Sequence, residues 1–286
     1  MSKIKFFEKI TSWTRVLNAA RRTIGKEPLS KEPSDSWKAK ILLAEHSPIR
    51  LLEFDWGWEE IKQWVSVHLV RHHTGCEKFV HSQRGDRRGL GEEYNVKSRD
   101  ELPQGAPNDM DMTANAQAMI NISRKRLCIG CASKETREAW TQVIDALRKD
   151  DPILADKCVP ECLYRGFCPE WMSTCNYCKS DAYKIALVDY RNTDYTNDWR
   201  GLELDGYQIN QRGKIRCLND NGEEIFLKMK IDTESGYGFY MINDMKVFPH
   251  LEVARLFVDG YDESTEDVIH IDGNKINNHK DNLKLV

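Results

Sequence analysis

The chain has 286 residues, of which 40% are hydrophobic and 30% charged, and its formal net charge is −3. This length and hydrophobic content suffice for two domains of ordinary size. No apolar run approaches the roughly 18 residues that a membrane-spanning helix needs, so we expect no membrane partner. The small net charge gives the whole chain no long-range attraction to nucleic acid.

Apolar residues recur at helical spacing in five segments of the first half of the chain. The second half favours short strands, a short helix around Leu251–Val258 and a final pair of strands. The fold class is therefore mixed α/β (α+β), with long helices first and a small β-rich module after them. The helices predicted for the first half cover residues 10–22, 37–44, 58–71, 114–128 and 134–149.

A loop rich in cationic residues follows the helix predicted over residues 58–71. Arg71-His72-His73 opens this loop and Ser82-Gln83-Arg84 closes it. Arg and His side chains can hold a phosphate or a planar anionic ring, and a Ser hydroxyl beside an Arg can hold a second phosphate. The alternative is a solvated basic loop that pairs with acidic neighbours.

These residues resemble the signature of the flavin-dependent thymidylate synthases, RHRxxSxxxxSxR. Arg71 and His72 match its opening, and Ser82-Gln83-Arg84 matches its closing SxR. His73 and Cys76 stand where the signature has Arg and Ser.

Two further segments resemble the same family. Glu45-His46-Ser47-Pro48 is similar to its His-(Ser/Thr)-Pro turn near the flavin, and Asn115–Arg126 is similar to its late helix. Gln117 stands where that helix usually has an Arg. The resemblance covers residues 10–150.

The resemblance implies FAD-dependent methylation of dUMP to dTMP, or a closely related pyrimidine nucleotide modification. Methylene-tetrahydrofolate would be the carbon donor and NADPH the reductant. Because the cofactor carries the difficult chemistry, the protein would supply orientation and charge. Arg126 would contact the pyrimidine and polarise it. The implied flavin contacts are His46, Ser47, Arg71, His72, His73, Asn115 and Asn121, and the implied nucleotide contacts are His68, Ser82, Gln83, Arg84 and Arg126. The family also implies a homotetramer whose active sites form between subunits.

A second resemblance lies at the other end of the chain. Residues 268–283 are similar to the HNH module of homing endonucleases, and residues 199–218 to the short DNA-binding repeat that precedes such modules. His270 would be the general base beside a divalent metal. Asn282 would orient that base or hold the loop.

The metal ligands of such a nuclease are harder to find. Ile269 stands where an Asp or Asn ligand is usual, and the sequence ends at Val286, ahead of the helix that carries a further Asn ligand. Asp272 and Asp281 could bind the metal, but they fit turn and cap positions better.

Charge also argues against tight DNA binding by this module. Residues 196–286 contain 11 Lys and Arg against 17 Asp and Glu, whereas DNA affinity rests largely on neutralising phosphates. We expect weak DNA contact through residues 195–286 and a lost nuclease activity. One alternative is an HNH homing endonuclease or DNA-binding protein with a non-catalytic synthase-like domain. Another is a non-catalytic nucleotide-binding relative. The joining of the two modules suggests a phage or mobile-intron history.

Five of the nine cysteines lie close together in sequence. Residues 1–8 lack the apolar stretch of a signal peptide, so we expect a cytoplasmic location where thiols stay reduced. Four thiolates could then hold a tetrahedral structural Zn²⁺; buried small hydrophobes and an iron–sulfur cluster are the alternatives. The candidate ligands are Cys158, Cys162, Cys168, Cys175 and Cys178.

We place the domain boundary at the polar run of residues 191–197. This gives a synthase-like domain over 1–190, which includes the Cys-rich segment 158–178. The DNA-binding repeat and the HNH-like module then occupy 191–286.

Overall fold

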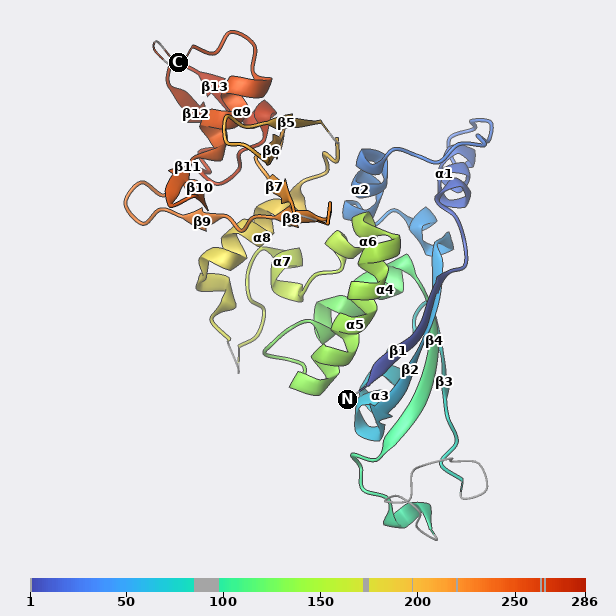
Figure 1. Ribbon diagram of the computed structural model, residues 1–286. Coiled ribbons are helices and arrows are strands. Elements are labelled where there is room, and N and C mark those ends of the chain that lie inside the picture. Colours follow the sequence, from blue (N-terminus) through green and yellow to red (C-terminus); the bar gives the residue numbers. More distant parts are fainter. Residues whose placement is uncertain are drawn as a thin grey trace. The chain divides into compact units, whose positions relative to one another are not determined.

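The computed structural model of the chain describes residues 2–84, 98–171, 175–196, 198–219, 221–262, 264 and 266–286. The chain divides into two compact units, Met1–Cys178 (unit 1) and Lys179–Val286 (unit 2). Unit 1 combines long helices with a sheet, and unit 2 is built mainly from short strands (Figure 1), which confirms the predicted mixed α/β class with a β-rich second part. The predicted modules 1–190 and 191–286 differ from these units in the placement of helix α8 (Asp181–Arg191), which groups with unit 2.

Unit 1 is built on a four-stranded antiparallel sheet in the order β1-β2-β4-β3. Its strands are β1 (Lys3–Lys9), β2 (Glu53–Lys62), β3 (Cys76–Val80) and β4 (Pro107–Asn115). Its α-helices are α1 (Trp13–Arg22), α2 (Asp35–Leu43), α3 (Gln63–Val70), α4 (Ala116–Arg126), α5 (Lys134–Asp150), α6 (Pro152–Lys157) and α7 (Glu161–Arg165), and its short 3-10 helices are η1 (Ser47–Leu51), η3 (Arg99–Glu101) and η4 (Tyr177–Lys179), the last of which crosses into unit 2.

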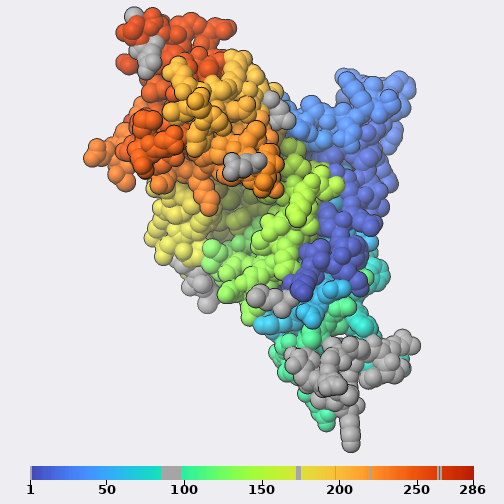
Figure 2. Space-filling model, viewed as in Figure 1, coloured from blue at the N-terminus to red at the C-terminus, as the bar shows by residue number. Residues whose placement is uncertain are grey.

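Buried tryptophans fix the helices of unit 1 against its sheet. Trp56 and Trp58 of β2 are both 0% exposed. Trp140 of α5 meets Trp56 edge to face, with the ring centroids 5.9 Å apart. Trp140 Nε1 also donates to Ser123 Oγ of α4 at 2.9 Å. Helix α5 therefore lies beside the sheet, with strand β1 next to it (Figure 1; Figure 2), where Lys9 Nζ and Asp150 Oδ2 are 3.1 Å apart.

The helix predicted over residues 58–71 is wrong in its first part. Strand β2 continues to Lys62, and only Gln63–Val70 is helical. Trp58, Ile61 and Val65 fit helical spacing, but burial of alternate residues of β2 against α5 makes the strand the better-packed choice. The pairing of β2 with β4 is interrupted between Trp58 and Ile61, and Glu60 has a φ of 56° there.

The other four predicted helices are present with shifted ends. They correspond to α1, α2, α4 and α5, of which α1 begins at Trp13 and α4 only after β4 has ended at Asn115. The helix predicted near Leu251–Val258 corresponds to α9 (Pro249–Phe257) of unit 2.

Unit 2 contains small antiparallel sheets around one apolar core. The sheets are β5-β6-β7-β8, β11-β10-β9 and β12-β13. Ile209, Ile215, Tyr240, Val253 and Leu283 are among the core residues. The strands are β5 (Trp199–Gly201), β6 (Tyr207–Asn210), β7 (Ile215–Leu218), β8 (Glu224–Phe226), β9 (Lys230–Ile231), β10 (Gly238–Ile242), β11 (Met245–Val247), β12 (Val268–His270) and β13 (Leu283–Leu285), and η5 (Lys280–Asn282) precedes the last.

None of the helices in the described ranges is both long enough and apolar enough to cross a bilayer.

The turn between α3 and β3 depends on a glycine. Gly75 has a φ of +74°, and a Cβ built on it would lie 2.6 Å from Asn115 Nδ2. We expect Gly75→Ala to lower the unfolding free energy by about 2–3 kcal/mol, because left-handed strain and a steric clash act together. Urea denaturation measures this loss. Gly25→Ala is the matched control, because Gly25 also has a positive φ but a Cβ built on it would meet no atom within 4 Å. Equal losses in both variants would contradict the role of the Asn115 contact.

Candidate functional site

The predicted synthase-type residues of unit 1 fall in separate places. His68, His72 and Arg126 come together where the C-terminal ends of α3 and α4 meet. Asn121 lies on another face of α4, beside the turn that carries His46 and Ser47. Ser82-Gln83-Arg84 follows the far end of β3.

Arg126 is held by one group within α3 and by one residue just after that helix. Its Nε donates to His72 Nε2 at 2.9 Å, and an NH2 group donates to the His68 carbonyl oxygen. Lys78 of β3 donates to the His72 carbonyl oxygen, and Cys76 Sγ lies 3.2 Å from the same oxygen. We call His68, His72, Lys78 and Arg126 the His72 cluster.

Burial and charge keep the imidazoles of this cluster neutral. Burial, together with Arg126, Lys78 and His73, lowers the pKa of His72 to about 4. Burial and the nearby Arg126 and Arg71 also lower the pKa of His68. His72 Nε2 therefore accepts from Arg126 as a neutral ring, and its proton must lie on Nδ1.

The cations of the His72 cluster have no acidic partner within the part of the chain that the structure describes. Arg126 contacts the imidazole of His72 and the carbonyl of His68, and Lys78 contacts a carbonyl and a thiol. The pKa of Arg126 is lowered by burial and by the neighbouring Arg71. Cations that face one another without a carboxylate form a site ready for an anion.

A second polar group on α4 is, in contrast, charge-balanced. Glu45 binds Arg124 through one carboxylate oxygen and accepts from Gln117 Nε2 at 2.5 Å through the other. Asn121 Oδ1 accepts from Arg124 NH1 at 3.0 Å. Arg124 also stacks on Tyr164, with Cζ 3.4 Å from the ring centroid. Because Arg124 and Arg126 are two positions apart on a helix, their side chains leave opposite sides of α4.

Glu45 joins this face of α4 to the predicted flavin turn. It directly precedes His46 and Ser47 and has a φ of 49°. Both His46 and Ser47 are exposed and line a groove of about 640 Å³ together with residues of α1 and α2.

Asn115 has a structural task at the start of α4. Its Oδ1 accepts from the backbone N–H of Ala118 at 2.9 Å, which caps the helix. Its backbone N–H donates to the Gly75 carbonyl at 2.9 Å, which ties the cationic turn to the sheet. A contact of Asn115, Asn121, Arg71 or His73 with a flavin stays a prediction.

Ser82-Gln83-Arg84 lies away from the His72 cluster within one chain. Ser82 Oγ accepts from the Arg84 backbone N–H at 3.3 Å. Cys76 is the first of the five residues of β3, and the motif follows the last residue of that strand. At about 3.4 Å per residue the strand spans roughly 17 Å, further than one nucleotide phosphate can bridge by side-chain contacts alone.

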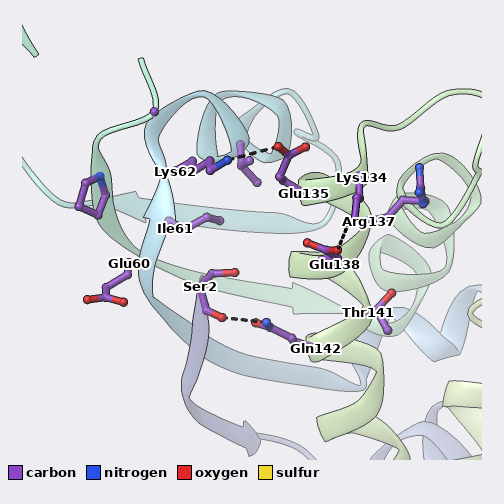
Figure 3. Close-up of a pocket in the computed structure, with 13 residues that line it drawn as sticks. Ser2, Glu60, Ile61, Lys62, Lys134, Glu135, Arg137, Glu138, Thr141 and Gln142 are labelled. Atoms are coloured by element: carbon purple, nitrogen blue, oxygen red, sulfur yellow. Dashed lines mark hydrogen bonds and ion pairs between the residues drawn. The ribbon is translucent and has the colours of Figure 1, made fainter. Parts of the chain in front are cut away.

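A larger cavity of about 740 Å³ lies between the end of β2 and the first turns of α5 (Figure 3). Its six charged side chains are three acids and three bases, and four of the six form ion pairs. Lys62 Nζ and Glu135 Oε1 are 3.2 Å apart, and Lys134 and Glu138 form a second pair at 3.8 Å. Gln142 Nε2 donates to the Ser2 carbonyl at 2.8 Å. This balance makes the cavity a poorer anion site than the His72 cluster.

In unit 2 the predicted base His270 is 8% exposed. Its Nε2 lies 3.0 Å from Asn278 Oδ1, and its Nδ1 is buried without a hydrogen-bond partner among the described residues. His250 of α9 packs against it, with the ring centroids 5.3 Å apart, and its Nδ1 is also buried and unpaired there. Burial lowers the pKa of both rings, that of His250 to about 4.

The loop after His270 is held by its own polar side chains. Asp272 accepts from Asn277 Nδ2 at 2.7 Å and from Asn282 Nδ2 at 2.9 Å. Asn282 also donates to the Asn277 carbonyl at 2.8 Å. These bonds fit the loop-holding role considered for Asn282 and the turn role favoured for Asp272. Asp281 lies exposed in the first turn of η5, whose cap is His279.

Sequence reasoning missed four partners of these residues. Lys78 could have been found from strand alternation, because it stands two residues after the buried Cys76 and so shares its side of β3. Glu45, Asn278 and His250 carry no such signal, because only the folded chain brings them to Arg124 and His270.

No protein-family model matches the chain, and a search of characterised protein sequences found no match. Solved structures do show similarity. The UMP/dUMP methylase PolB from Streptomyces cacaoi, bound with 5-Br dUMP, is 15% identical, with a TM-score of 0.42 over 58% of this chain and 95% of that chain. The flavin-dependent thymidylate synthase ThyX from Helicobacter pylori, complexed with FAD and dUMP, is 16% identical, with a TM-score of 0.44 over 55% and 99%.

The HNH homing endonuclease I-HmuI is 29% identical, with a TM-score of 0.27 over 31% of this chain. The chain spans about half of that endonuclease, 52%. The solved structures thus include the two kinds of protein that the sequence motifs resemble. At these TM-scores the likeness supports no conclusion about function. The proposed function rests on the geometry of the site instead.

The neutral His72 predicts how stability depends on pH. Its pKa in the folded chain is lowered to about 4, whereas an unfolded histidine titrates at about 6.5. The unfolded chain therefore takes up a proton first, and the unfolding free energy falls as the pH is lowered from about 6.5 toward 4. Urea midpoints across this range should fall less in His72→Gln than in the wild type.

An NMR titration of Arg126→Ala should show a raised pKa for His72. An unchanged pKa of His72 in this variant would contradict the electrostatic cause.

Proposed function

We propose that unit 1 is a FAD-dependent enzyme that methylates a pyrimidine nucleotide, either dUMP or a close relative of it. The observation that carries this proposal is the His72 cluster, in which Arg126 and Lys78 are fixed by neutral groups and face no carboxylate in the described chain. Its sequence neighbours Arg71 and His73 add further cationic capacity.

The cluster fits the charges of a flavin and a nucleotide. Arg126 and Lys78 lower the pKa of His72, and Arg71 lowers the pKa of Arg126, so a bound anion would relieve the repulsion among these cations. Guanidinium groups suit phosphates and ring carbonyls because they offer two parallel N–H donors. Arg126 keeps donor groups beyond the two bonds that anchor it, since a guanidinium has five N–H donors.

Each residue then has a task in the proposed reaction. Arg126 donates to the pyrimidine carbonyl and stabilises negative charge that develops on it. Neutral His72 fixes the orientation of Arg126 without adding a competing charge. Bound FAD would supply the one-carbon transfer and the redox chemistry that no side chain can supply. The residues proposed to hold it are His46, Ser47, Arg71, His72, His73, Asn115 and Asn121.

The nucleotide phosphate would be held by Ser82, Gln83 and Arg84 of a second copy of the chain. The length of β3 separates this motif from Arg126 in its own chain, and active sites between subunits of a homotetramer are what the family resemblance implies. Strand β3 is an edge strand, and Phe79 on it is 65% exposed. An exposed aromatic on a sheet edge suits burial against another copy.

Methylene-tetrahydrofolate as carbon donor and NADPH as reductant complete the proposal. Both follow from the family resemblance. Weak DNA contact through unit 2 stays a prediction.

Arg126 is the residue that tests the reaction. We expect Arg126→Ala to lower the rate of methyl transfer to dUMP by roughly 10²–10³-fold, the usual effect of removing a donor to a developing oxyanion. Arg126→Lys should recover little, because an ammonium lacks the planar fork. The measurement is single-turnover product formation with FAD-loaded protein, NADPH and methylene-tetrahydrofolate, with UMP as a parallel substrate.

Arg148→Ala is the matched control, because Arg148 pairs with Asp156 on the outside of α5 and should leave the rate unchanged. Two results would contradict the proposal. One is a wild-type protein that takes up no flavin, and the other is a reduced flavin that reoxidises at the same rate with and without pyrimidine nucleotide.

Mixing two inactive variants tests the composite site. Arg84→Ala and Arg126→Ala should each have little activity alone, whereas a mixed oligomer contains some sites with both arginines intact. We therefore expect activity to reappear after the two proteins are dissociated and reassembled together. Mixing two preparations of the same variant is the control. No recovery in oligomers shown to be mixed would place both arginines in one chain's site.

A further inference from the structure

Six of the nine cysteines of the chain lie near one another in unit 1, and four of them line one small cavity. The cavity has a volume of about 200 Å³, and Cys128, Cys162, Cys168 and Cys175 all line it. Cys128 comes from the connection between α4 and α5, Cys162 from α7, and the others from the segment that follows α7. Sequence segments more than thirty positions apart thus bring their thiols to the same place.

The thiols also contact one another. Cys178 interacts through hydrogen bonds with both Cys162 and Cys168. Cys162 further interacts with Cys128. Cys128, Cys162 and Cys168 thus line one cavity, and Cys178 bonds to two of them; we call these four residues the four-thiol chain.

Cys131 lies at the edge of this group and has a different partner. Its Sγ is 2.7 Å from Glu170 Oε1, and it also contacts Cys128.

Several large apolar side chains around the cavity are exposed, although Leu163 of α7 is buried. Phe167 is 58% exposed, Trp171 is 86% exposed, and Ile129 is 56% exposed. Helix α7 has five residues and η4 has three. These exposed side chains contribute little to holding the segment, so a cross-link or a metal would stabilise its conformation.

Two observations limit what the cross-link can be. All nine cysteines are free. Among the residues that the structure describes, no group of three or more His, Cys, Asp or Glu is already arranged as a metal site. A cysteine side chain has a single rotatable bond before its sulfur, so rotation about χ1 can turn the lining thiols inward.

We propose that this cavity is a structural zinc site, in which Cys128, Cys162, Cys168 and Cys178 close around one Zn²⁺. Four thiolate ligands in a tetrahedral arrangement are the usual structural set for this ion. Binding releases the four thiol protons to solvent, forms four Zn–S bonds and oxidises nothing. The ion joins the α4–α5 connection to the segment after α7.

This proposed ligand set differs from the one that sequence spacing suggested. Cys158 is 4% exposed and lies beside Ser123, next to Asp151 and Arg148 and away from the cavity. Cys128 takes its place, although it lies thirty residues earlier in the sequence. Spacing within residues 158–178 could not show this, because only the fold brings α4 to α7.

Zinc content and thiol protection together test the proposal on the full-length protein. We expect one zinc per chain after purification under reducing conditions. Substitution by Co²⁺ should give the intense visible bands of a tetrahedral site and sulfur-to-cobalt charge transfer. In the wild type, metal should protect Cys128, Cys162, Cys168 and Cys178 from alkylation, and a chelator should remove that protection. This readout needs no variant and so does not depend on a variant's folding.

Cys162→Ser and Cys178→Ser should abolish the cobalt bands, whereas Cys131→Ser and the unit 2 variant Cys217→Ser should keep them. Absence of zinc above background together with absent cobalt bands would overturn the proposal. So would a disulfide within the four-thiol chain, the visible absorption of an iron–sulfur cluster, or metal-dependent protection that excludes Cys128. Flavin binding is measured separately, so failure here leaves the proposed function of unit 1 untouched.

Discussion

The packing of β2 against α5 is the constraint on which the candidate site of unit 1 depends. Trp56 packs against Trp140, and Trp58 Nε1 donates to the Ala139 carbonyl. These contacts keep β2 extended as far as Lys62, so α3 can begin only at Gln63. The same sheet carries β4 to Asn115, where the Asn115 side chain starts α4. His72 follows the end of α3 and Arg126 ends α4. The hydrogen bond between them therefore depends on where two strands of one sheet stop.

Charge compensation separates the polar groups of unit 1 into two kinds. The Glu45 group and the cavity beside α5 pair each named cation with a carboxylate. The exposed pair of Lys62 with Glu135 contributes little to stability. The His72 cluster instead holds its cations with carbonyls and a neutral ring. Keeping cations together without an acid lowers the stability of the empty protein. A bound anion would recover that free energy, which is why we place ligand binding at this cluster.

Sequence reasoning reached the parts of the site that lie within one element. The run from Asn115 to Arg126 predicted a helix with its polar residues in place, and Arg71-His72 predicted a cationic turn. It failed where two periodicities overlapped. Trp58, Ile61 and Val65 satisfy a helix, and only the packing of β2 against α5 decides for a strand. It also failed for partners distant in the chain. Lys78 reaches His72 because β3 pairs with β4, and Cys128 reaches Cys162 because α4 meets α7.

Unit 2 shows how residues of a catalytic motif can serve packing. A general base must reach its proton donor and exchange protons with water. His270 is instead 8% exposed, its Nε2 faces Asn278, and its ring packs beside that of His250. Two buried imidazoles side by side are stable only while both are neutral, because a charge on either would be desolvated and repelled. Asp272 and Asn282 meanwhile bind each other across the loop. With Ile269 in the position of a metal ligand, these residues are better placed to hold β12 to β13 than to activate a water molecule.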